Sequence, residues 1–286
     1  MGLGLLPLVN MMKNKIKMIA LDMDGTCLNE KGEMTKETKA SIESVGEKGI
    51  LVVIATGRPL SGLSEEVMSL KNIGYIITLN GARVYKNEDK TTVFKQGISK
   101  DSLKEIEKIL EQQDVLVDAF IENKGYCSRT HYETTEKNIK DKSFLNYYHF
   151  TRRPLEDLWK FINSQEESVE KINLFFNDLG RKEKLKNKLE GIDKVKISSG
   201  LENNLEVNDA MVDKGNALKR LTAMLDINMA EVLACGDSGN DMEMLRQVGI
   251  SVVMENAKDE VKEIADFITL SNKENGVAYA LKKYLG

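Results

Sequence analysis

Cysteine, proline, histidine and tryptophan are scarce in this sequence of 286 residues, which contains three, three, two and one of them respectively. The three cysteines are far apart and form no CxxC pair, which argues against a disulfide framework and a structural zinc site. The two histidines also belong to no cluster of metal-binding residue types. This usage favours a reducing compartment, and we expect a cytoplasmic protein.

Long apolar runs and an excess of basic charge are also missing. The apolar part of the N-terminus is too short to cross a bilayer, which takes about 20 residues, and it lacks the basic start and cleavage site of a signal peptide. The 41 lysines and arginines are outnumbered by 45 acidic residues, which disfavours nucleic-acid binding. We therefore expect neither a membrane nor a nucleic acid as partner.

Residues 1–16 are interpreted as a leader that precedes the folded chain. This leader is either a disordered segment or the product of an upstream start codon, since Met11, Met12 and Met18 would serve as later starts. The whole chain, with 41% hydrophobic and 30% charged residues, has the composition of a soluble globular protein and is long enough for two domains.

Short apolar runs alternate with amphipathic stretches in the first and last thirds of the chain. The expected strands span 17–22, 50–56, 75–85, 231–237 and 250–254, and the expected helices span 35–49, 58–72, 214–225, 240–248 and 258–265. Thr35 can cap the first helix, and Pro59 suits the start of the second. This alternation predicts a Rossmann-like α/β core, a doubly wound parallel sheet covered on both faces.

The middle third has a different pattern, richer in aromatic and charged residues. Strand-like runs lie at 91–97, 115–122, 169–178 and 193–198, and an amphipathic helix is expected over 101–112. We predict an inserted α+β cap over 87–202, between core segments 17–86 and 203–286. Within the cap, Arg152 and Arg153 are interpreted as a solvent-exposed pair rather than as ligands of an anionic substrate group.

Two pairs of aspartates follow expected strands of the core. Asp22 and Asp24 end the run ALDMD, and Asp237 and Asp241 follow the run EVLACG. Ligands of parallel α/β sheets bind beyond the carboxyl ends of the strands, so all four carboxylates are expected to converge if the two strands are central neighbours. Two such charges about 4 Å apart repel by about 4 kcal/mol at an effective dielectric constant of about 20. Either some of these acids are protonated or a cation holds them together, and ligands that are all oxygens favour Mg²⁺.

Further residues fit a bound phosphate. Thr56 and Gly57 end a third expected strand directly before a helix, where a hydroxyl, backbone N–H groups and the helix N-terminus bind anions. Lys214 opens a helix, a position at which a cation is unusual unless it compensates a negative charge. Asn240, between Asp237 and Asp241, can donate to a phosphate or substrate oxygen.

Taken together, these segments resemble a known family. DMDGT at 22–26, ATGR at 55–58, DKGNAL at 213–218 and GDSGNDMEML at 236–245 stand in the order found in haloacid dehalogenase-like hydrolases. The sequence is most similar to the Cof-type sugar-phosphatase branch, in which a large cap is inserted between the second and third motifs. The resemblance implies a phosphoric monoester hydrolase acting on small phosphomonoesters, sugar phosphates above all.

The resemblance also implies a role for each motif residue. Asp22 would be the nucleophile that forms an aspartyl-phosphate, and Asp24 would protonate the leaving alcohol and then deprotonate the attacking water. The implied ligands of Mg²⁺ are Asp22, the backbone carbonyl of Asp24, Asp237 and Asp241. The implied phosphate-binding residues are Thr56, Gly57, Lys214 and Asn240.

Other functions share parts of this pattern. A phosphomutase of the same superfamily would use the same aspartyl-phosphate chemistry, and a sugar-phosphate sensor without turnover would keep the same binding residues. A receiver domain of two-component signalling also phosphorylates an aspartate, but it needs about half this length and no large insertion. The motifs specify neither the physiological substrate, nor the orientation of the cap, nor the oligomeric state.

Overall fold

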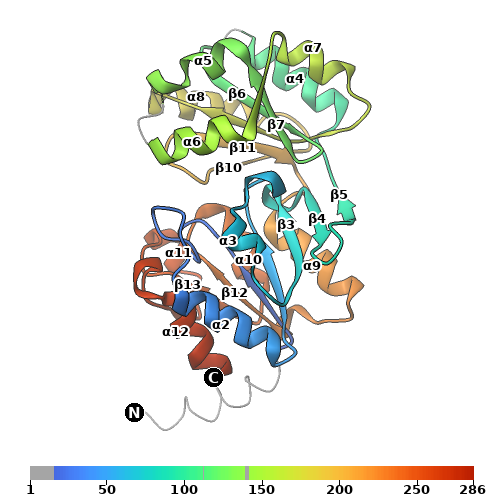
Figure 1. The fold of residues 1–286 in the computed structure, drawn as a ribbon. Helices are drawn as coiled ribbons and strands as arrows, with labels where there is room; N and C mark the ends of the chain where they lie inside the picture. Colours follow the sequence, from blue (N-terminus) through green and yellow to red (C-terminus); the bar gives the residue numbers. More distant parts are fainter. Residues whose placement is uncertain (1–15, 112, 139–141) are drawn as a thin grey trace.

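The computed structural model describes residues 16–111, 113–138 and 142–286. The strands form two sheets that lie one above the other (Figure 1). We call the eight-stranded sheet with its helices the core, and the six-stranded sheet with its helices the cap. The expected leader, apart from Ile16, lies outside the described residues.

The core sheet has the strand order β14-β13-β12-β1-β2-β3-β4-β5, and its neighbours from β14 to β3 run parallel. Its strands are β1 (Met18–Leu21), β2 (Leu51–Ala55), β3 (Ile73–Thr78), β4 (Arg83–Lys86), β5 (Thr92–Lys95), β12 (Val232–Gly236), β13 (Ile250–Val253) and β14 (Phe267–Ile268). Its helices are α2 (Lys36–Glu47), α3 (Glu65–Met68), α9 (Lys214–Met224), α10 (Met242–Gln247), α11 (Asp259–Lys262) and α12 (Gly276–Leu285).

Helices cover both faces of the core sheet, as the alternation of apolar runs predicted. In β1, Ile19 and Leu21 pack into the cluster that contains α2 and α12. Met18 and Ala20, which point to the opposite face, pack with α9 and α10. Full burial of each larger side chain contributes about 1.5–3 kcal/mol. The Rossmann-like doubly wound α/β fold is therefore confirmed.

The cap is a six-stranded sheet of order β10-β11-β9-β6-β7-β8 with its own helices. Its strands are β6 (Leu116–Ile121), β7 (Lys124–Ser128), β8 (Arg152–Leu155), β9 (Val169–Phe175), β10 (Val195–Ser198) and β11 (Asn204–Asp209). Its helices are α4 (Lys100–Leu110), α5 (Arg129–Asn138), α6 (Lys142–Thr151), α7 (Leu158–Ser164) and α8 (Leu179–Leu189).

Alternating side chains of β9 separate the two faces of the cap sheet. Ile172 and Leu174 pack with α4, α7 and α8 in an apolar cluster. Lys171, Asn173 and Phe175 point the other way and line a cavity between cap and core. One face of the cap sheet thus holds the cap together, and the other face is available to a ligand.

Two expectations about chain organisation differ from the structure. The strand expected at 91–97 is β5, which pairs with β4 in the core sheet, and β11 pairs with β9 in the cap sheet. The chain therefore crosses from core to cap, and back from cap to core, at later positions than the expected boundaries at 87 and 202.

The helix expected over 58–72 was wrong. That stretch forms a 3₁₀ turn, Leu60–Gly62, followed by the single-turn helix α3. The cap interrupts it, because Asn123 accepts the N–H of Leu60 and Ser61 donates to the carbonyl of Asn123 at 3.1 Å. These contacts with the cap replace the intrahelical hydrogen bonds that the sequence pattern predicted.

Candidate active site

The aspartates after β1 and β12 lie together because these two strands are neighbours in the core sheet. Leu21 is in register with Cys235, and the N–H of Asp22 donates to the Cys235 carbonyl at 3.1 Å. Each strand then ends in a polar loop at the same edge of the sheet, as expected for a ligand site of a parallel sheet. Asp22 therefore enters the site next to Asp237.

Lys214 is completely buried between two of these carboxylates. Its Nζ lies 2.6 Å from Oδ1 of Asp22 and 2.7 Å from Oδ1 of Asp241. Burial lowers the pKa of the Lys214 ammonium, but Asp22 and Asp241 outweigh burial and raise its pKa above the ordinary value. The lysine therefore stays charged and orients the carboxylate of Asp22.

Asp22, Asp237 and Asp241 form a cluster in which one oxygen of each lies within 4.8 Å of the others. Burial, and then the charge of Asp241, raise the pKa of Asp22 well above its usual range, although Lys214 opposes the shift. Burial and Asp241 also raise the pKa of Asp237 to about 6. One lysine thus compensates three carboxylates incompletely, and the hard oxygen donors fit a divalent cation such as Mg²⁺.

Hydrogen bonds hold the second acidic pair in place. Oδ2 of Asp241 accepts the N–H groups of Asp237 and Ser238, both at 3.0 Å. Thr26 donates its hydroxyl to Oδ1 of Asp237 at 2.8 Å. Gly25, with a φ of +81°, approaches Asp237 so closely that a Cβ would lie 2.8 Å from its Cγ. The DMDGT and GDSGND segments therefore pack directly against each other.

Asp24 does not join this cluster, contrary to the expectation that all four carboxylates converge. Its oxygens accept Nε of Arg58 at 2.7 Å and Nη2 of Arg58 at 2.5 Å. The exposed Asp24 carboxylate is thus engaged by this guanidinium and lies outside the cluster. A role of the Asp24 backbone carbonyl in metal binding stays a prediction.

The four predicted phosphate-binding residues occupy two depths. Gly57 and Asn240 line the cavity, and Asn240 donates to Oδ1 of Asn80 at 3.2 Å. Thr56 and Lys214 are fully buried below them. The Thr56 hydroxyl accepts the N–H of Arg58 at 3.1 Å. In this structure the hydroxyl therefore stabilises its own loop and does not face the cavity.

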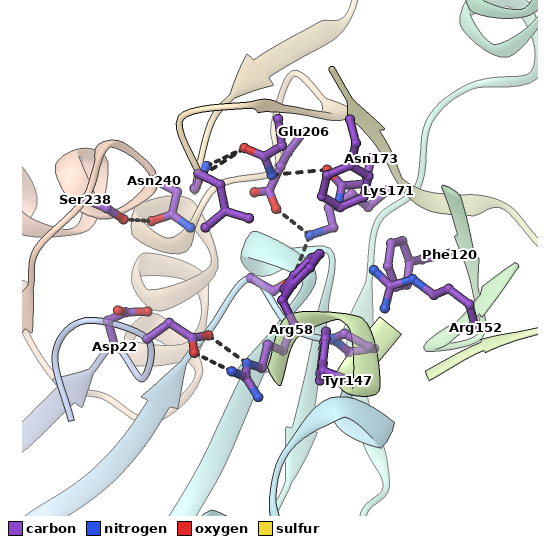
Figure 2. A pocket seen from close by; sticks show the side chains of 18 of the residues that line it. Asp22, Arg58, Phe120, Tyr147, Arg152, Lys171, Asn173, Glu206, Ser238 and Asn240 are labelled. Carbon is purple, nitrogen blue, oxygen red and sulfur yellow. Dashed lines mark hydrogen bonds and ion pairs between the residues drawn. The ribbon is translucent and has the colours of Figure 1, made fainter. Parts of the chain in front are cut away.

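A cavity of about 200 Å³ separates this edge of the core from the polar face of the cap sheet. Figure 2 shows Asp22, Ser238 and Asn240 on one side of it, and Phe120, Arg152, Lys171 and Asn173 on the other. The cap residues that line it are Phe120, Phe144, Tyr147, Arg152, Lys171, Asn173, Phe175, Gly200, Leu201, Asn204 and Glu206. The predicted core motifs and the predicted insertion thus form one site.

Polar contacts close the cap onto the core around this cavity. Lys171 donates to the carbonyl of Gly57 at 2.7 Å and to Oε1 of Glu206 at 2.8 Å. Asn80, from the turn after β3, donates to Oε2 of Glu206 at 2.6 Å. The guanidinium carbon of Arg58 lies 4.7 Å from the centre of the Tyr147 ring. The cap therefore places its side chains directly above the loop that contains Gly57 and Arg58.

Sequence reasoning missed part of this site. The interpretation of Arg152 and Arg153 as a solvent-exposed pair was wrong for Arg152, which is buried, lines the cavity and pairs with Asp118 at 2.8 Å. Arg153 is exposed, as expected. The two lie next to each other in β8 and so point to opposite faces of the cap sheet. Arg58 was recognised within ATGR but was given no role.

Other expectations about the whole chain can be compared with the structure. All three cysteines are buried as free thiols, so the expected absence of a disulfide framework agrees with their positions. Within the described ranges, no helix combines the length and the apolar character needed to cross a lipid bilayer.

Comparison with known proteins identifies the class to which this fold and site belong. A family model described as haloacid dehalogenase-like hydrolase matches residues 19–281, and the chain belongs to this family. Among its relatives, 5-amino-6-(5-phospho-D-ribitylamino)uracil phosphatase YcsE of Bacillus subtilis is 32% identical over 270 residues, which are 94% of this chain and 96% of YcsE. Phosphatase YwpJ of the same organism is 31% identical over 293 residues, 94% of this chain and 100% of YwpJ.

Solved structures agree with this assignment. A haloacid dehalogenase-like hydrolase from B. subtilis superposes with a TM-score of 0.85 at 27% identity, over 93% of this chain and 99% of that chain. The HAD subclass IIB sugar phosphatase BT4131 superposes with a TM-score of 0.79 at 25% identity, over 94% of this chain and 98% of that chain. The predicted family and the predicted enzyme class, a phosphatase, are both confirmed.

Proposed function

We propose that this phosphatase hydrolyses small phosphomonoesters, sugar phosphates in particular, with Mg²⁺ as cofactor and through an aspartyl-phosphate on Asp22. The observation that carries the proposal is the cluster of buried Asp22, half-buried Asp237 and buried Asp241, with Lys214 beneath it and a cavity above it. A phosphoryl group above Asp22 would also meet Gly57 and Asn240, which line the same cavity.

In the first step, an oxygen of Asp22 attacks phosphorus, and the bond between phosphorus and the alcohol oxygen breaks on the opposite side. Lys214 holds Asp22 through Oδ1 and so orients the attacking carboxylate. Asp24 gives its proton to the departing alcohol oxygen. In the second step, Asp24 takes a proton from water, which attacks the aspartyl-phosphate, releases inorganic phosphate and restores Asp22.

Asp22, Asp237 and Asp241 are the residues that would hold Mg²⁺. The cation would supply positive charge that neutralises the phosphoryl oxygens in an in-line displacement. Gly57, through its backbone N–H, and Asn240, through its side-chain amide, would hold the remaining phosphoryl oxygens. A cavity of about 200 Å³ suits a small-molecule substrate, and the three buried thiols are consistent with a cytoplasmic location.

The test is release of phosphate from p-nitrophenyl phosphate and from a panel of sugar phosphates, with Mg²⁺ and with EDTA. Asp22→Asn should lower the rate by at least about 10³-fold, because an amide cannot form the phospho-enzyme. Asp226→Asn, an exposed aspartate outside the cavity, is the matched control and should keep the wild-type rate. Mass spectrometry of the trapped wild-type enzyme should find one phosphoryl group on Asp22.

Three results would contradict the proposal. Full activity of Asp22→Asn would show that Asp22 is not the nucleophile. Equal rates with Mg²⁺ and with EDTA would show that Mg²⁺ is not the cofactor. Transfer of the phosphoryl group to a second sugar phosphate instead of water would identify a phosphomutase. Release of a single phosphate per enzyme without steady turnover would identify a sensor.

A further inference from the structure

Arg152, a cation on the cap side of the cavity, is neutralised inside the protein. Its Nε lies 2.8 Å from Oδ2 of Asp118, and Asp118 also accepts the hydroxyl of Tyr148 at 2.7 Å. Arg152 and Asp118 are both buried, with 6% and 0% of their surfaces exposed. Solvent does not screen such a pair, so the carboxylate cancels most of the charge that the arginine offers to a ligand.

Lys171, the second cap cation, is neutralised in the same way. Its Nζ lies 2.8 Å from Oε1 of Glu206, and both side chains line the cavity. Burial opposes ionisation of Glu206, but Lys171 and the hydrogen bonds from Lys171 and Asn80 hold its pKa below the ordinary value. Glu206 therefore carries its negative charge at neutral pH beside Lys171.

The core cations are engaged as well. Lys214 lies between Asp22 and Asp241, and Arg58 pairs with Asp24. Among the described residues that line the cavity, every arginine and lysine is thus paired with a carboxylate. On the cap side of the cavity, where Arg152 and Lys171 stay paired, a second anionic group would meet no uncompensated cation, which is unfavourable.

Aromatic side chains form part of the remaining cap wall. Phe144 and Tyr147 come from α6 and Phe175 from β9, and we call these three residues the aromatic wall. The ring centre of Phe144 lies 5.9 Å from that of Tyr147 and 5.7 Å from that of Phe175. The planes of these two pairs are inclined at 37° and 62°, and the three rings together offer apolar surface against which a planar ring packs favourably.

One polar group beside this wall is open to a ligand. Oδ1 of Asn173 accepts Nδ2 of Asn204 at 3.2 Å, and its own Nδ2 has no acceptor among the residues that the structure describes. Asn173 is only 5% exposed and lines the cavity. Its amide can therefore donate to a hydroxyl or carbonyl oxygen of the leaving group.

From these contacts, and resting on the proposed function, we infer the class of substrate. We propose that the preferred substrate is a phosphomonoester whose leaving group is uncharged and carries a planar ring. The aromatic wall packs against the ring, and Asn173 binds a neutral oxygen. Asp118 and Glu206 are specificity residues, because they cancel the cap cations that would otherwise accept a carboxylate or a second phosphate.

Three phosphomonoesters that differ by one feature test this inference. Ribose 5-phosphate has no planar ring, uridine 5′-monophosphate adds a neutral ring, and orotidine 5′-monophosphate adds a carboxylate to that ring. We expect kcat/KM for the uridine ester to exceed that for ribose 5-phosphate about fivefold or more, from packing on the aromatic wall. We expect kcat/KM for the orotidine ester to be at least about tenfold lower than kcat/KM for the uridine ester.

Substitutions then test which residues determine these ratios of kcat/KM. Glu206→Gln should leave Lys171 charged and raise the orotidine-to-uridine ratio of kcat/KM about tenfold. Phe175→Leu should lower the uridine-to-ribose ratio towards one and leave the orotidine-to-uridine ratio unchanged. Glu167→Gln is the matched control, because Glu167 also pairs with a lysine, Lys95, but at the exposed surface outside the cavity. It should change neither ratio.

The outcomes separate this inference from the proposed function. If p-nitrophenyl phosphate is not hydrolysed at all, the proposed function fails. If p-nitrophenyl phosphate is hydrolysed but the three esters react equally, or if Glu206→Gln leaves the orotidine-to-uridine ratio unchanged, the inference is overturned. Asp118→Asn, which should free the charge of Arg152 and raise the same ratio, decides the matter if Glu206→Gln does not fold.

Discussion

Arg58 holds the carboxylate of Asp24 through two nitrogens, Nε at 2.7 Å and Nη2 at 2.5 Å. While both of its oxygens are bound in this way, Asp24 cannot also reach the leaving oxygen of a substrate, as a general acid must. Nη1 of Arg58 also donates to the carbonyl of Gly62 at 3.2 Å, so the arginine stays anchored at the mouth of the site. Catalysis by Asp24 therefore requires that its pair with Arg58 opens when substrate enters.

Asp24→Asn should separate the two steps of the reaction. The p-nitrophenolate leaving group needs little protonation, so Asp22 should still be phosphorylated by p-nitrophenyl phosphate. Without a base, attack of water should slow by about 10²–10⁴-fold. Stopped-flow absorbance should therefore record a burst of p-nitrophenol close to one equivalent of enzyme, followed by slow turnover.

An alkyl phosphate supplies the internal comparison for this variant. Its leaving oxygen is strongly basic, so Asp24→Asn should also slow the first step and no burst should appear. A steady rate near that of the wild type on either substrate would show that Asp24 is not the acid and base.

The core could be predicted from sequence because its signals are local. The continuous apolar run of β1, which is buried on both faces, and the polar residues directly after each strand are written in short segments. The capping of α2 by Thr35, whose hydroxyl oxygen accepts the N–H of Thr38 at 3.1 Å, was visible in the same way. Asp22 and Asp237 then lie together because β1 and β12 are neighbours, a strand order that the local signals leave open.

The cap side of the site could not be predicted, because its chemistry depends on pairing between distant residues. Lys171 and Glu206 lie in β9 and β11, 35 residues apart, and appear as ordinary surface charges in sequence. Arg152 became a buried residue only through Asp118, which is 34 residues away. The expected helix over 58–72 failed for the same reason, since Asn123 of the cap reshapes it.

Lys214→Met tests the charge balance beneath the nucleophile. Removal of this buried cation leaves Asp22 and Asp241 uncompensated, which should lower the free energy of unfolding in EDTA by about 3–5 kcal/mol at mildly alkaline pH. Denaturant titration measures this loss. Lys95→Met, which breaks an exposed pair with Glu167, should cost less than about 1 kcal/mol. Equal losses in the two variants would contradict the proposed balance.

The pH dependence of Mg²⁺ binding follows from the raised pKa of Asp237, about 6. The folded, metal-free protein favours protonated Asp237 relative to the unfolded chain, so ionisation of Asp237 costs stability as pH rises through about 6. Mg²⁺ binds the ionised form and removes this cost above that pH. Below it, a proton must first leave, at a cost of about 1.4 kcal/mol for each pH unit.

We therefore expect saturating Mg²⁺ to raise the melting temperature more at about pH 7.5 than at about pH 5, by roughly 3 °C. Differential scanning fluorimetry at matched ionic strength measures both shifts, with NaCl in place of MgCl₂ as the control for screening. A larger shift at the lower pH would reverse the sign and contradict the assignment of Asp237 as a ligand.

Gly25 and Gly32 form a matched pair for testing the contact between the two acidic segments. Both have positive φ, +81° and +75°, so an alanine is strained to a similar degree at each position. A Cβ on Gly25 would lie 2.8 Å from Cγ of Asp237, whereas a Cβ on Gly32 would have no neighbour within 4 Å.

Gly25→Ala should therefore displace Asp237 and raise the Mg²⁺ concentration for half-maximal activity at least about tenfold. Gly32→Ala should share only the strain, about 1 kcal/mol of unfolding free energy, and keep the wild-type Mg²⁺ dependence. If both variants shift the Mg²⁺ dependence equally, backbone strain and not the position of Asp237 controls metal binding.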